Sequence, residues 1–116
     1  MSYDVIGDLA GYLNRKLDVP TSSQVPKQRP AEFITIERTG GSSEVGADRP
    51  GLSIQTWSTT EAKAYELALA ARLVLLECWQ ELPMVIRVEV ASIYNFPDPS
   101  SKQARYQIDV SMVTRL

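Results

Sequence analysis

The stretch that decides the fold runs from Ser58 to Gln80 and reads STTEAKAYELALAARLVLLECWQ. The Ser-Thr-Thr-Glu opening is a capping box, in which Ser58 is the expected N-cap and Glu61 lies three residues further on. The alanine- and leucine-rich run that follows predicts a helix to about Gln80, because Pro83 prevents further extension. Apolar residues cover so much of this helix that we expect it to pack against a sheet and a second surface, such as a neighbouring subunit.

Two long runs with the two-residue period of β-strands follow this helix, at 84–94 and 104–113. The linker between them, NFPDPSSK (95–102), is stiff and short enough to join them as an antiparallel hairpin. The sequence before the helix predicts a helix at 3–17, capped by Ser2 or Asp4, and strands at 33–38 and 52–57. We therefore expect a single α+β domain over 1–116, in the order α-β-β-α-β-β, with two helices on a mostly antiparallel four-stranded sheet.

Two segments are expected to lack regular structure. Residues 18–31 contain three prolines and predict an extended connector. Residues 39–51, TGGSSEVGADRPG, predict a flexible glycine-rich loop that is longer than packing requires.

Composition excludes several classes of function. The chain has no histidine and one cysteine, so the commonest general base, the commonest metal ligand and a thiolate zinc cage are all missing. We expect Cys78 to be a buried structural thiol, and we expect no catalytic, cofactor-binding or metal-binding residues. The closest approach to an acid–base pair is Glu89 and Asp109, which could face each other across the hairpin beside Arg87 and Arg105; charges on the solvent side of a sheet explain them more simply.

Charge argues against a general nucleic-acid binder. The net charge is −2, with 12 basic and 14 acidic residues, and the two signs interleave along the first 50 residues. No run of about 18 apolar residues predicts a membrane-spanning helix. The N-terminus lacks the pattern of a signal peptide, so we expect synthesis in a cytoplasm.

The aromatic residues at element ends leave two alternatives open. Trp57, Trp79, Tyr94 and Phe96 either cover the core or anchor a protein–protein contact, where aromatic residues are enriched.

Read in order, the chain resembles the tail terminator and head–tail completion proteins of long-tailed bacteriophages. The resemblance covers the whole chain and is based on the order of its helices, strands and connecting segments. It consists of the amphipathic N-terminal helix, the connector ending in Arg29-Pro30, the strand FITIER (33–38), the stretch Thr39-Gly40-Gly41, the strand LSIQTW (52–57), the helix opening STTEA (58–62), the turn NFPDP (95–99) and the last strand RYQIDV (105–110).

The resemblance implies a virion structural protein of the neck or tail, made in the cytoplasm of a bacterial host. It implies no enzymatic activity and no cofactor. Six copies would form a ring that caps the tail tube, ends its polymerisation and meets the head connector. The implied partners are the chain itself, the major tail tube protein and the head completion or connector protein, with DNA passing through the ring and no membrane or sequence-specific nucleic acid involved.

Within this interpretation, the 39–51 loop orders on binding and docks the tube or the adjacent subunit. Arg38 and Arg49 would make charge-assisted contacts there. The 95–102 turn would meet the head side. The candidate protein contact residues are Arg38, Gly40, Gly41, Glu44, Arg49, Trp57, Phe96 and Asp98. The alternatives are a head completion (stopper) protein, a non-viral oligomerising adaptor, and a small-ligand or enzyme domain using a pocket between helix and sheet.

Overall fold

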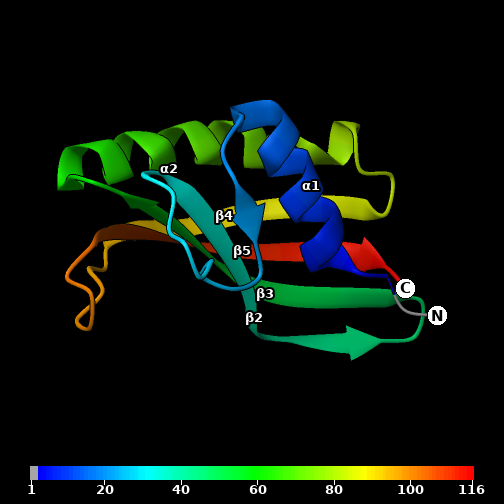
Figure 1. The fold of residues 1–116 in the computed structure, drawn as a ribbon. Helices are drawn as coiled ribbons and strands as arrows, with labels where there is room; N and C mark the ends of the chain where they lie inside the picture. The colour runs from blue at the N-terminus through cyan, green and yellow to red at the C-terminus, as the bar shows by residue number, and fades with distance from the viewer. Residues whose placement is uncertain (1–2) are drawn as a thin grey trace.

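In a computed structural model, the described residues 3–116 form a single α+β domain with two helices on one face of a five-stranded sheet (Figure 1). The strand order is β1-β2-β3-β5-β4, and every neighbouring pair is antiparallel except β1 and β2. The predicted fold class and the final hairpin are confirmed; the sheet has one strand more than expected.

The extra strand lies in the segment predicted as a connector. β1 (Thr21–Ser22) pairs in parallel with Ile34 and Thr35 of β2. It follows α1 (Val5–Leu17), which Asp4 caps by accepting a hydrogen bond from the Gly7 amide. The alternative cap, Ser2, lies outside the described residues.

The loop predicted at 39–51 is corrected by the structure. β2 (Phe33–Glu44) and β3 (Ala47–Ser58) pair along their whole lengths and leave only Val45 and Gly46 as the turn. Glycine and serine content predicted flexibility there. The backbone of this segment instead finds partners: β3 lies between β2 and β5, so its first residues are paired on both sides.

The central helix starts later and ends earlier than predicted. α2 spans Glu61–Leu76, and its N-cap is Thr60, whose hydroxyl accepts a hydrogen bond from the Lys63 amide. Ser58 cannot cap it, because Ser58 is the last residue of β3 and its hydroxyl instead donates to Glu32. A 3₁₀ turn, η1 (Cys78–Gln80), follows α2 and leads to β4 (Val85–Asn95) and β5 (Ala104–Arg115).

The core lies between the helices and the sheet. α2 packs over β3, β5 and β4, whereas α1 packs against α2, β1 and β2. The long strands each contribute one isoleucine to a row that crosses the sheet: Ile36 pairs with Ile54, Ile54 with Ile108, and Ile108 with Ile93. The side chains of Ile36, Ile54 and Ile108 are fully buried, and burying each contributes roughly 1.5–3 kcal/mol.

The opposite face of the sheet carries no helix and holds a polar ladder. Thr35 donates to Gln55, Gln55 donates to Gln107, and Gln107 donates to the hydroxyl of Tyr94. These side chains come from four different strands, so their hydrogen bonds tie β2, β3, β5 and β4 together across the open face.

Candidate functional site

A hairpin arm, residues 39–51, forms one end of the β2–β3 pair, and its return strand also pairs with the last residues of β5. Residues 39–46 are all exposed, and Val45 at the tip is fully exposed. A register shift between Arg38 and Gly40 marks a β-bulge at the base of the arm, and bulges of this kind bend a strand. In Figure 1 the outer part of β2 turns away from the inner part at this place.

Gly41 is required by the local geometry of the arm. Its φ is +104°, and a Cβ atom there would lie 2.1 Å from the carbonyl oxygen of Arg49. Side chains rarely tolerate either condition. Gly40 has open space around it, so the two adjacent glycines of the predicted site have different roles.

The charged residues predicted on this segment pair within the arm. Arg38 binds both carboxylate oxygens of Asp48 at 2.7 and 2.9 Å, and the Ser43 hydroxyl adds a hydrogen bond of 2.8 Å to the same carboxylate. The Arg38 guanidinium lowers the pKa of Asp48 to about 2. Arg49 pairs with Glu44 at 3.0 Å on the exposed side. The predicted contact residues Gly40, Gly41, Glu44 and Arg49 therefore lie together on one preformed arm, with Arg38 directly before it.

The other three predicted contact residues lie at the opposite end of the sheet. Trp57 has only 2% of its surface exposed and stacks on Phe33, with ring centroids 5.1 Å apart. Trp57 is thus buried, but on the open face of the sheet, where its Nε1 donates to Thr35, and its ring offers almost no surface to another molecule. Phe96 is 42% exposed and contacts Tyr94 edge to face.

Arg105 joins Trp57 and Phe96. Its guanidinium carbon lies 4.8 Å from the Trp57 ring centroid and 4.4 Å from that of Phe96, and its Nε donates to the Phe96 carbonyl. Burial lowers the pKa of Arg105. The stacking fixes the predicted turn 95–102 against the end of the sheet.

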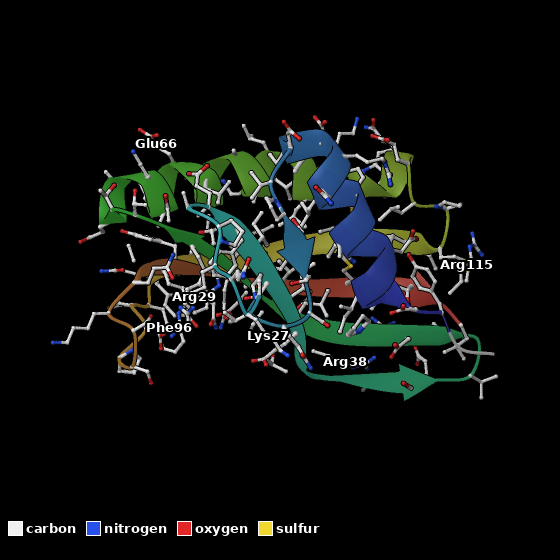
Figure 2. The ribbon with its side chains drawn as sticks, in the orientation of Figure 1. Lys27, Arg29, Arg38, Glu66, Phe96 and Arg115 are labelled. Atoms are coloured by element: carbon white, nitrogen blue, oxygen red, sulfur yellow. The ribbon has the colours of Figure 1, made fainter. Side chains whose placement is uncertain are left out.

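Asp98 holds the same turn from within. Its carboxylate accepts hydrogen bonds from Ser101 and from the backbone of Ser100. Arg29 of the connector reaches this turn and donates to Ser101 and Gln103 at 3.1 and 3.0 Å. Figure 2 shows Arg29 and Phe96 near each other at this end of the molecule, with Arg38 lying far from them. This contact of Arg29 was not predicted from the sequence, because the path of the connector is a tertiary feature.

The sheet has two free edges, and the strands that form them were not identified from the sequence. β4 has β5 on one side and no strand on its other side, and β1 covers β2 only at Ile34 and Thr35. The outer edge of β2 over residues 36–44 and the outer edge of β4 over residues 85–95 are therefore unpaired within residues 3–116. Unpaired edges can template pairing with another chain.

A groove runs between the free edge of β4 and α2. It has a volume of about 340 Å³ and is lined by Tyr65, Leu69 and Arg72 of α2 and by residues 90–93 of β4. Leu73 on the same side of the helix is 64% exposed. The wide apolar stripe predicted on this helix is real: one part faces the sheet, and the part beside β4 is exposed.

The residues that could support other chemistry are separated or sequestered. In the register of β4 and β5, Glu89 lies opposite Ser111, whereas Asp109 lies opposite Ser92 and accepts a hydrogen bond from its hydroxyl. The two carboxylates are therefore not directly opposite each other. Cys78 is fully buried, and burial raises the pKa of its thiol to about 11. Over residues 3–116, no three His, Cys, Asp or Glu side chains gather in a way that could hold a metal ion. None of the helices in that range has the length and apolarity needed to cross a membrane.

Comparisons with known proteins leave the family open, since no family model matches this chain and no curated protein matches its sequence.

Proposed function

We propose that this protein is a tail terminator of a long-tailed bacteriophage. Copies of the chain form a ring on the end of the tail tube, end the polymerisation of the tube and present a surface to the head connector. The observation that carries the proposal is the pair of free sheet edges on opposite sides of one small domain. A repeating ring needs two different, complementary surfaces on each copy, and these edges supply them.

The two ends of the sheet suit contacts with two further partners. The hairpin arm lies at one end with a preformed backbone and paired charges. The 95–102 turn, with Phe96 exposed, lies at the other end. In a ring whose axis runs along the strands, the arm meets the tail tube protein on one side and the turn meets the head completion protein on the other. DNA passes along the axis.

The test mixes the purified protein with isolated tail tubes and, separately, with portal-bearing heads, followed by electron microscopy of both. A tail terminator decorates one end of the tubes and leaves the portals bare. Decorated portals with bare tubes would instead assign the chain to the head completion proteins. Absence of protein from both would reject a role in the phage neck.

A further inference from the structure

We infer that copies of this chain join edge to edge, with β4 of one copy pairing antiparallel with residues 36–44 of β2 in the next. The inference rests on the proposed ring and names the joint that builds it. The occupant of the free β4 edge is thus a second copy of the same chain, and one continuous sheet would cross each joint.

The strand directions support this joint. β2 is antiparallel to β3, β3 to β5, and β5 to β4, so β2 and β4 run in opposite directions. A second copy placed beside β4 in the same orientation therefore presents its β2 antiparallel to β4. Because neither copy has to be inverted, the same joint repeats around an axis that runs along the strands. This is a heterologous contact, and such contacts close into rings when the rotation fits.

The two free edges also lie at the same height in the sheet. At one end, Glu44 pairs with Ala47, Ala47 with Arg115, and Val85 pairs with the neighbouring residue Thr114. In the middle, the isoleucine row joins Ile36 of β2 to Ile93 of β4. Residues 36–44 of one copy can therefore lie opposite residues 85–93 of the next without either copy sliding along the strands.

Placing residues 36–44 of one copy opposite residues 85–93 of the next brings complementary charges together. Arg87 is exposed and takes part in no salt bridge within residues 3–116. It lies in the row of Ser42, which pairs with Arg49, and Arg49 and Arg87 line one hollow on the open face of the sheet. Across the joint, Arg87 would lie opposite Ser42 of the next copy and diagonal to its Glu44, within reach of long side chains.

Apolar surface would be covered at the same joint. Val45 at the arm tip and Ile86 at the start of β4 are both exposed. The pairing of residues 36–44 with residues 85–93 places them at the same end of the joint. The next copy would also cover the exposed side of α2 that lines the groove beside β4. Covering such surface on a small domain stabilises association in proportion to the apolar area removed from water.

Thiol cross-linking of the purified chain tests the joint. The double variant Ser42→Cys with Arg87→Cys is treated with a short bismaleimide, and the products are separated on a denaturing gel. Within one copy the two sites lie on strands separated by β3 and β5, roughly 14 Å apart, so a short linker favours contacts between copies. The native thiol of Cys78 is fully buried and does not compete.

We expect a ladder of covalent multimers from the double variant and monomers from each single variant. The matched control, Ser42→Cys with Glu66→Cys, places the second thiol on the exposed side of α2 that points away from the sheet (Figure 2) and should give no ladder. Dimers from Arg87→Cys alone would show a two-fold β4–β4 contact and overturn the inference. A double variant that yields no more product than the control would also overturn it.

A charge-reversal pair gives an independent readout. Arg87→Glu should weaken each joint about tenfold in sedimentation experiments, and adding Glu44→Arg should restore assembly. A merely destabilised protein would not be rescued by the second change, so lack of rescue argues against this register. Both experiments use the purified chain without tail tubes. A failure of the contact between copies is therefore distinguished from a failure to cap the tube.

Discussion

The guanidinium of Arg38 and the carboxylate of Asp48 form a two-point ion pair along the hairpin arm, with N···O distances of 2.7 and 2.9 Å. The pair joins the residue that precedes the β-bulge to the second residue of the return strand, which lies near the turn of the arm. Together with the Ser43 hydroxyl it holds a segment rich in glycine and serine as a regular hairpin.

Asp48→Asn should therefore destabilise the protein near neutral pH by about 1 kcal/mol, after solvent screening of a partly exposed pair is taken into account. The pKa of Asp48 is lowered from 3.8 to about 2 in the folded state. The stabilisation is present above the unfolded-state pKa and is lost as the pH falls through the folded-state value. Urea unfolding at several pH values should show the wild type and the variant converging near pH 2. Glu44→Gln, in an exposed pair, is the control and should change stability little.

Gly41→Ala should destabilise the arm by about 1–3 kcal/mol, because the new methyl group would meet the Arg49 backbone at a positive φ. Gly40→Ala is the matched control, since no atom lies within 4 Å of the position its Cβ would take. Amide hydrogen exchange over residues 39–51 measures the effect directly. Equal protection in the two variants would contradict the close approach at Gly41.

Arg105→Ala should cost about 1–2 kcal/mol, because it removes the cation that stacks on both Trp57 and Phe96. Arg105→Lys should recover only part of this loss, since an ammonium group cannot stack as a planar guanidinium does. Chemical unfolding gives the stability, and near-ultraviolet circular dichroism reports the packing of Trp57. Full recovery by lysine would show that the charge alone matters.

Deletion of residues 41–47 should leave the domain folded and abolish capping of the tail tube. The β2 and β3 strands pair through residues 33–38 and 52–57, outside the deleted segment, so far-ultraviolet circular dichroism should keep its α+β character. Complementation of a phage that lacks the gene, with tail lengths measured by electron microscopy, gives the functional result. Tails of normal, uniform length would refute a role of the arm in capping.

Phe96→Ala should reduce head–tail joining while costing less than about 1 kcal/mol of stability, because the ring is 42% exposed. Val25→Ala is a suitable control: Val25 is 39% exposed and lies in the connector. The fraction of particles with heads joined to tails is the measurement. Unchanged joining in the Phe96 variant would count against the assignment of this turn to the head side.

Elements with strong periodicity were predictable from the sequence. The 84–94 and 104–113 runs alternate because one face of each strand meets the core and the other does not, and the structure places both as strands of one antiparallel hairpin. The helices were predictable in type for the same reason. Their ends were not, since the start of α2 depends on where β3 stops.

The arm was not predictable, because its order comes from partners distant in sequence. Glycine and serine have weak local preferences for strands, and the pairing of Ala47 with Arg115 joins the arm to the last strand of the sheet. The burial of Trp57 on the open face also depends on the neighbouring strand, which supplies Phe33.

Alternation and helical period, which are local properties of the chain, determined the fold class, and the glycine-rich composition of residues 39–51 identified them as a candidate contact segment. Only the tertiary structure decided which strands became edges and which aromatic side chains were buried. Strand order is set by pairing between distant segments, and no local pattern distinguishes the last strand of a sheet from one that has neighbours on both sides.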